Sequence, residues 1–105
     1  MWVDRSGNEI ESVLYADDAY LYSSVYSGCN HDLIYFALYK FKEDGTYTEL
    51  GYFPAEKVSD TAVRLPLTDF GIDQFDIGEY FFSIVYTDIG VEEEASSSLE
   101  ITQSI

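Results

Sequence analysis

The sequence predicts an all-β fold, a two-sheet antiparallel sandwich of seven to eight short strands. Side chains alternate in character with a period of two along several runs, most clearly over 19–26 and 33–42. This is the pattern of strands that bury one face. Turn signals made of Asp and Gly separate several of the runs, and no segment has a convincing helical period. Short strands joined by such turns favour a two-sheet sandwich.

The strongest predicted strand covers 33–42 and leads into the hairpin signal Glu43-Asp44-Gly45. The returning strand covers 46–53 and stops at Pro54. Further strands are expected near 9–15, over 19–26, around Val63, Leu65 and Leu67, over about 79–87, and over 94–103. In the strand 33–42, one face carries Ile34, Phe36 and Leu38, and the other carries Tyr35, Ala37, Tyr39 and Phe41.

The chain of 105 residues is expected to form one domain. Residues 9–105 make up the predicted sandwich, and 1–8 are expected to be a flexible leader or a covering segment, with Trp2 and Val3 as its apolar residues. No apolar run reaches the roughly 18 residues of a membrane helix, so no membrane insertion is expected. The compartment stays open, with an extracellular, cell-surface or virion location slightly favoured.

The charge limits the classes of partner. Twenty acidic residues against five basic ones give a formal charge of −15. Such a surface repels the phosphates of nucleic acids and anionic lipid headgroups, and it suits a basic protein partner or bound cations. No nucleic-acid binding is therefore expected. The single cysteine, Cys29, has no internal disulfide partner, so the fold is expected to rely on its hydrophobic core.

The segment 76–82 has the sequence Asp-Ile-Gly-Glu-Tyr-Phe-Phe. Its D-x-G-x-Y-x-F spacing resembles the tyrosine corner of immunoglobulin-like domains, in which a tyrosine begins strand F and hydrogen-bonds back across the E–F corner. The resemblance covers 19–103 and implies an immunoglobulin-like sandwich that lacks the usual disulfide. It implies that Tyr80 is a buried corner residue. It also implies core positions for Ser23, Phe36 and Phe82, where the family carries its cysteines and its tryptophan.

Related sandwiches, such as fibronectin type III domains and polycystic-kidney-disease repeats, end with a similar Gly-x-Tyr strand. The resemblance therefore does not choose between these sets. Domains of this kind usually bind other proteins, adhere, or space out neighbouring domains, but a fold does not by itself transfer a function.

The sequence contains no pattern that specifies catalysis, so no enzymatic activity and no cofactor are expected. The one histidine, His31, lies in a polar segment beside Asp32, where a solvated imidazole is the ordinary case. Zinc-ligand spacings and phosphate-binding loops are absent. Calcium has only weak candidate ligands, since the spacing is not that of an EF-hand and a solvated loop is preferred. These candidates are Asp69, Asp73, Asp76 and Glu79.

A binding surface is predicted on the outer face of the strands 33–42 and 79–87. If Phe36 and Phe82 point into the core, period-two alternation turns their neighbours outward. The resemblance makes these strands the adjacent C and F strands, so the outward side chains form one patch, which Tyr47 or Tyr52 would extend. Large apolar patches usually mark contact sites. The predicted protein-binding residues are Tyr35, Tyr39, Phe41, Phe81 and Val85.

Two functions follow as hypotheses. The first is a non-enzymatic protein-interaction, adhesion or structural module that binds a protein partner, or a second copy of itself, through this aromatic C–F–G face. The alternative is a small acidic inhibitor or immunity-type protein that occupies the basic site of a nucleic-acid-binding enzyme, which the charge favours. The aromatic residues also have a purely structural interpretation, as cross-strand pairs that pack on one another or lie under 1–8.

Overall fold

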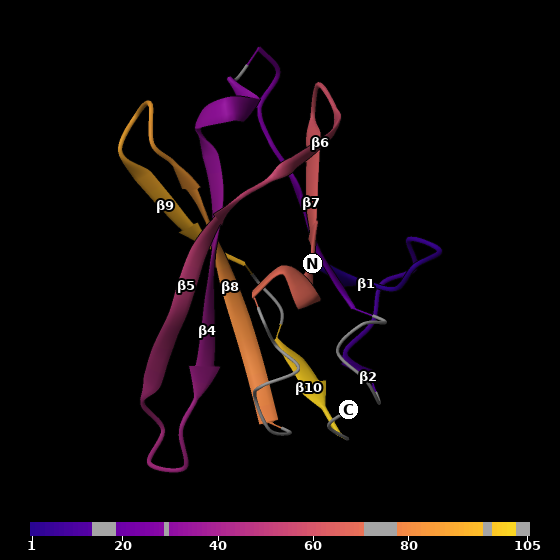
Figure 1. Cartoon of the computed structure of the whole chain (residues 1–105), viewed down its shortest axis with the longest axis vertical. Coiled ribbons are helices and arrows are strands. Elements are labelled where there is room, and N and C mark those ends of the chain that lie inside the picture. Colours follow the sequence, from indigo (N-terminus) through magenta and orange to yellow (C-terminus); the bar gives the residue numbers. More distant parts are fainter. Residues whose placement is uncertain (14–18, 29, 71–77, 96–97, 103–105) are drawn as a thin grey trace.

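The structure is a computed structural model that describes residues 1–13, 19–28, 30–70, 78–95 and 98–102. In these residues it contains ten strands, two short 3-10 helices and no α-helix. The strands form two sheets that pack against each other (Figure 1). The predicted all-β class is confirmed, and the two-sheet arrangement is consistent with a β-sandwich.

The smaller sheet has four antiparallel strands in the order β1-β3-β7-β6. Leu21 of β3 and Val63 of β7 point from it into the core and are fully buried. Its strands are β1 (Trp2–Val3), β3 (Tyr20–Ser24), β6 (Glu56–Ser59) and β7 (Ala62–Pro66).

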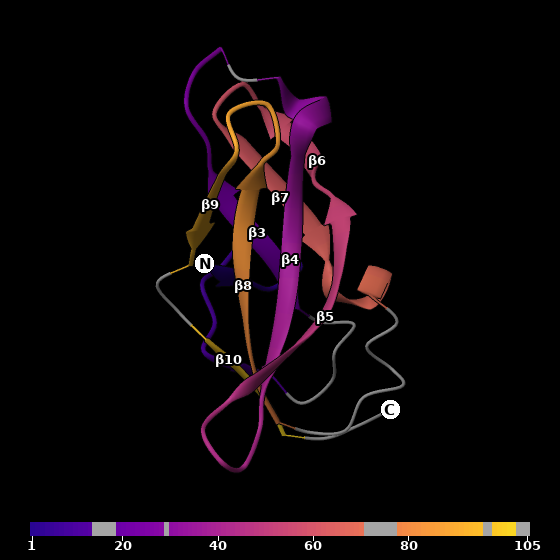
Figure 2. The same cartoon turned by 90° about the vertical axis from the view of Figure 1, so that its left-hand side faces the viewer.

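The larger sheet has the order β2-β10-β8-β4-β5, and β9 also pairs with β8. One edge of β8 pairs with β4, and the other edge pairs with β9 over 83–86 and with β10 over 78–80. Figure 2 shows β9 and β10 in succession beside β8. The strands are β2 (Ser12–Val13), β4 (Ile34–Phe41), β5 (Tyr47–Pro54), β8 (Gly78–Tyr86), β9 (Val91–Glu94) and β10 (Leu99–Ile101).

One pair of strands departs from the predicted antiparallel pattern. β2 runs parallel to β10, with Ser12 opposite Glu100 and Val13 opposite Ile101. A parallel pair cannot be closed by a short hairpin, and here most of the chain connects the two strands. The pair joins the N-terminal part of the chain to the last strand of the larger sheet.

Two positions predicted in strands lie instead in 3-10 helices. Leu33 belongs to η2 (His31–Leu33), which precedes β4, and Leu67 belongs to η3 (Leu67–Phe70), which follows β7. Pro66 ends β7, because proline has no N–H to donate to the ladder. Leu67 is nevertheless fully buried and belongs to the core between the sheets.

The core depends on the pairing of β4 with β8. Phe36 lies opposite Ile84 and Leu38 opposite Phe82, and all four side chains are buried between the sheets. The rings of Phe36 and Phe82 meet edge to face with centroids 5.4 Å apart, an arrangement that aromatic pairs prefer. Tyr80 joins the same core and is fully buried.

The N-terminal segment differs from the leader expected over 1–8. Trp2 and Val3 form β1, and Trp2 lies opposite Leu21 with 0% of its surface exposed. The indole packs edge to face on Phe82, with centroids 5.1 Å apart. These two residues therefore form a buried strand of the smaller sheet, because burial of the large indole in the core is favourable. The segment covers the core between the sheets, not the outer face of β4 and β8.

This packing predicts that Trp2 is essential to stability. Replacement of a fully buried large aromatic by alanine typically costs about 3–5 kcal/mol, so Trp2→Ala is expected to lower the free energy of unfolding by an amount of that order. Urea unfolding of the wild type and the variant measures the loss, with Ser6→Ala as a control at an exposed position of the same segment. An unchanged midpoint for Trp2→Ala would show that the segment is not part of the core.

Candidate protein-binding face

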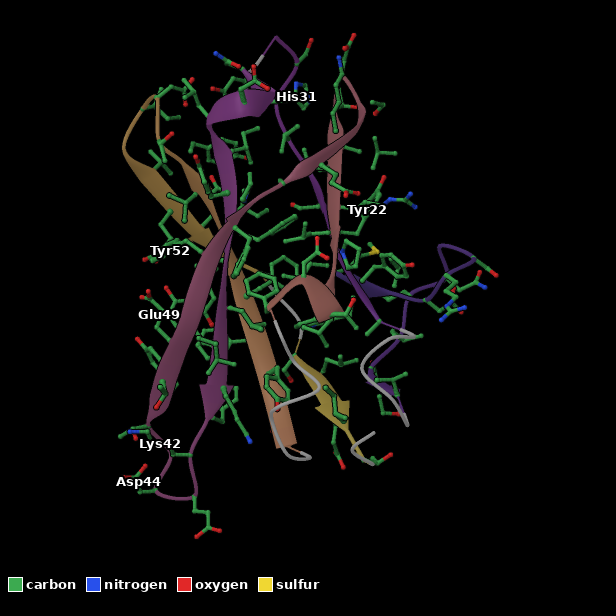
Figure 3. All side chains as sticks on the ribbon, in the orientation of Figure 1. Tyr22, His31, Lys42, Asp44, Glu49 and Tyr52 are labelled. Carbon is green, nitrogen blue, oxygen red and sulfur yellow. The ribbon has the colours of Figure 1, made fainter. Side chains whose placement is uncertain are left out.

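The side chains on the outer side of β4, β5 and β8 form one surface, which we name the aromatic face. The strand register places them beside one another, with Tyr39 opposite Phe81 and Tyr35 opposite Val85. Figure 3 shows the labelled Tyr52 on the side of β5 that points away from β7. The aromatic face consists of Tyr35, Tyr39 and Phe41 of β4, Tyr47 and Tyr52 of β5, and Phe81 and Val85 of β8.

The centre of the aromatic face is a group of packed rings. Tyr39 and Phe81 stack with centroids 4.9 Å apart and an angle of 13° between their planes. Phe41 lies 4.8 Å from Phe81, and Tyr47 meets Tyr39 and Phe81 edge to face at 5.4 Å and 5.2 Å. Tyr39, Phe81 and Ala37 form an apolar cluster that is separate from the core between the sheets.

Exposure within the aromatic face is uneven, which differs from the exposed patch predicted. Tyr39 is only 7% exposed and Phe81 only 6%, because neighbouring rings cover them. Phe41, Tyr47 and Tyr52 are exposed, the latter two at 57% and 48%. A partner would therefore meet these three side chains first, while Tyr39 and Phe81 support them from below.

A β-bulge brings Tyr52 onto the aromatic face. The register between β4 and β5 shifts between Leu38 and Tyr39, and an extra residue in β5 inverts the alternation beyond it. Tyr47 and Tyr52 therefore share the outer side, although their odd spacing would otherwise put them on opposite sides. Gly51, next to the shift, has a φ of 150°, a conformation that favours glycine.

Two carboxylates border the centre of the aromatic face. Glu49 of β5 lies opposite Tyr39, and the Tyr39 hydroxyl donates a long hydrogen bond of 3.4 Å to Oε1 of Glu92 on β9. Burial, then a hydrogen bond with Tyr52, then the negative charges of Glu92 and Glu49 raise the pKa of Tyr39 well above its ordinary value. The Tyr39 phenol is therefore a neutral donor held between two carboxylates.

An open hollow of about 580 Å³ lies on the same face, lined by Tyr35, Tyr52, Val85 and Thr87. Val85 is paired with Glu92 of the neighbouring strand β9, and the carboxylate of Glu92 accepts the hydrogen bond from Tyr39. Two aromatic rings, an apolar side chain and a hydroxyl line the hollow, and a carboxylate stands on the next strand. This combination suits a side chain that is partly apolar and carries a polar or charged end.

The corner expected from the resemblance lies partly outside the described residues. Tyr80 is fully buried near the start of β8, and Nζ of Lys40 lies 5.5 Å from the centroid of its ring. Residues 71–77, which precede β8, are not described. The hydrogen bond of the Tyr80 hydroxyl to backbone therefore stays a prediction.

The calcium candidates are also only partly described. Asp69 lies in η3 and Glu79 in β8, and both are exposed, whereas Asp73 and Asp76 fall outside the described residues. In the part of the chain that the structure describes, no group of three acidic, His or Cys side chains is placed to hold a metal ion. Calcium binding therefore stays a prediction.

His31 links the start of β4 to the smaller sheet. Its Nε2 lies 3.0 Å from the carbonyl oxygen of Ser59, at the end of β6. The imidazole thereby ties η2, at the start of β4, to the edge strand of the smaller sheet.

Within the described residues, no helix is long and apolar enough to cross a membrane.

The environment of Tyr39 predicts a pH dependence of stability. Its pKa in the folded protein is raised above the ordinary 10.0, so the unfolded chain ionises this phenol first as the pH rises. The corresponding contribution to the free energy of unfolding is complete below pH 10.0 and is lost as the pH rises from there through the folded pKa. Tyr39→Phe removes this contribution, and its stability should decline less steeply. Urea midpoints on both sides of pH 10.0 measure the two slopes; equal slopes would contradict the raised pKa.

No protein-family model matches the chain, and no curated protein matches it. The candidate site therefore rests on its own geometry and charge.

Proposed function

We propose that this protein is a non-enzymatic interaction module that binds a protein partner through the aromatic face. The observation that carries the proposal is the exposure of Tyr47 and Tyr52 beside the buried stack of Tyr39 and Phe81. Exposed large apolar side chains gathered in one patch usually mark contact sites, and tyrosine is enriched among the residues that contribute most to binding.

The packing of the rings supports binding at a low entropic cost. Tyr47 contacts both members of the stack edge to face, so its orientation is restricted before a partner arrives. Tyrosine also has few rotatable bonds for the area that it presents. A contact surface that is already ordered loses less conformational freedom on association, and more of the contact energy remains as affinity.

We further propose that the sandwich is immunoglobulin-like. The order β1-β3-β7-β6 in one sheet supports strands A, B, E and D, and the order β8-β4-β5 in the other supports F, C and C′. The buried Tyr80 near the start of β8 is the position that a tyrosine corner would take. In this assignment the aromatic face is the C–F–G side of the sandwich, with β5 as its C′ extension.

The acidic-inhibitor alternative has support from the strand β9. Glu92, Glu93 and Glu94 are successive exposed residues of this strand, and the whole chain carries −15. An inhibitor of a nucleic-acid-binding enzyme would compete with nucleic acid for its partner. If nucleic acid competes with this protein for its partner, and if salt strongly weakens the binding of that partner, the inhibitor is favoured over a module whose contact is chiefly aromatic.

The proposal predicts that the exposed tyrosines of β5 contribute strongly to partner affinity and little to the stability of the fold. Truncation of an aromatic side chain at the centre of a contact typically costs about 2 kcal/mol or more, which weakens binding by about thirtyfold. Tyr47→Ser combined with Tyr52→Ser is therefore expected to abolish capture of the partner. Urea midpoints of this double variant and the wild type should differ far less than those of a core variant.

Cross-linking capture from a native extract compares this double variant with wild type and with Tyr26→Ser. Tyr26 is a matched control, since it is 43% exposed and does not belong to the aromatic face. The proposal expects a protein that wild type and Tyr26→Ser capture and that the double variant loses. If all three proteins capture the same set, the aromatic face is not the contact site.

A further inference from the structure

The aromatic face is bordered by carboxylates that the fold itself does not neutralise. Glu49 lies opposite Tyr39 on one side, and Glu92 lies opposite Val85 on the other. Glu94 follows on the same side of β9, opposite Ser83. Among the described residues, neither Glu49 nor Glu92 forms an ion pair with a lysine or arginine. These charges face solvent and remain available to a partner.

Two lysines flank Phe41 of β4: Lys40, whose Nζ lies 5.5 Å from the centroid of the buried Tyr80 ring, and Lys42. Lys42 lies at the β4–β5 hairpin, where its charge lowers the pKa of Asp44 after the larger effect of the hydrogen bonds from Thr46. Figure 3 shows Lys42 and Asp44 at the hairpin and Glu49 and Tyr52 farther along β5. The surface around the hollow therefore combines aromatic rings with uncompensated negative charge.

We propose, on the basis of the proposed function, that the aromatic face binds a cationic protein segment and receives an arginine or lysine side chain in the hollow between Tyr35 and Tyr52. A cation over a tyrosine ring is attracted by the negative face of the π-system. The aliphatic stem of the same side chain can pack on Val85 while its charged end meets Glu92. A guanidinium can also donate two parallel hydrogen bonds to one carboxylate.

Charge complementarity selects this occupant over a second copy of the chain. Two copies joined through the aromatic face would bring Glu49 and Glu92 of each near those of the other, in molecules that each carry −15. Like charges placed together at a contact cost free energy and exclude the wrong partner. A nucleic acid or an anionic membrane is repelled for the same reason.

Two synthetic peptides test the inference by NMR titration of the amide signals. One is an extended peptide in which arginine alternates with leucine, and the other has citrulline in place of each arginine, which keeps the shape and removes the charge. The arginine peptide is expected to shift signals of β4, β5, β8 and β9 around the hollow, and to bind about tenfold more tightly than the citrulline peptide. Its affinity should fall from low to moderate ionic strength.

Matched variants separate the local site from the net charge. The double variant Glu49→Gln with Glu92→Gln should bind the arginine peptide about three- to tenfold more weakly than wild type. Glu11→Gln with Glu56→Gln removes the same charge at exposed positions away from the face and should have a smaller effect. Tyr52→Ala should weaken binding about two- to fivefold, whereas Tyr52→Phe should keep the ring's contribution.

Four results would overturn the inference. If the citrulline peptide binds the aromatic face as tightly as the arginine peptide, the proposed interaction function is retained, but recognition does not depend on a cation. Equal weakening by both glutamate pairs would assign the attraction to net charge alone. Sedimentation showing a dimer that Tyr47→Ser with Tyr52→Ser dissociates would make a second copy the occupant. If neither peptide shifts signals of the face, a cationic segment is not its ligand, and the capture experiment still decides the proposed function.

Discussion

The pairing of β4 with β8 is the constraint on which the rest of the structure depends. The register runs without a shift from Ile34 opposite Tyr86 to Lys40 opposite Tyr80. Because successive side chains of a strand point to opposite faces, a slip of one residue would exchange the two faces of a strand. The observed register sends Phe82 to the core and its neighbour Phe81 to the outer side. Both faces of one strand pair are therefore apolar, and only one of them lies between the sheets.

The flanking strands turn that second apolar face into a candidate site. β5 adds two exposed tyrosines on one side of the Tyr39–Phe81 stack, and β9 adds Glu92 on the other. The Tyr39 phenol links the two sides, since it contacts Glu92 and Tyr52 and lies near Glu49. The same ring is buried by its neighbours, which explains why the site is ordered although it faces outward. The buried rings of Tyr39 and Phe81 thus contribute to stability, and the exposed tyrosines beside them are the ones offered to a partner.

The period-two pattern predicted which residues of β4 and of β8 share a face, and the resemblance supplied the expectation that Phe36 and Phe82 face the core. Phe36 and Phe82 point inward and Tyr39 and Phe81 outward, because alternation is a property of the backbone alone. The exposure of Tyr39 was not predictable in this way, since it depends on rings from a third strand. The position of Tyr52 on the aromatic face depends on the β-bulge in β5. The one local sequence signal of this bulge was Gly51, an isolated glycine within a strand.

The N-terminal segment and the corner show the limits of a local pattern. Trp2 and Val3 are too short a run to predict a strand, and their place beside Leu21 is set by a long-range pairing. Leu67 was expected in a strand and lies in η3, because Pro66 interrupts the ladder. Turn chemistry predicted the hairpin at Glu43-Asp44-Gly45, where the Asp44 carboxylate accepts hydrogen bonds from Thr46. The calcium and corner hypotheses depend largely on 71–77, which lie outside the described residues.

Cross-strand nuclear Overhauser effects between β4 and β8 test the central claim most directly. The account predicts strong effects between the ring protons of Tyr39 and Phe81 and between those of Phe36 and Phe82, whose centroids lie 4.9 Å and 5.4 Å apart. It predicts none between the rings of Tyr39 and Phe82, which lie on opposite sides of the sheet. Strong effects between Tyr39 and Phe82 would show a shifted register, and the aromatic face would then belong to the core.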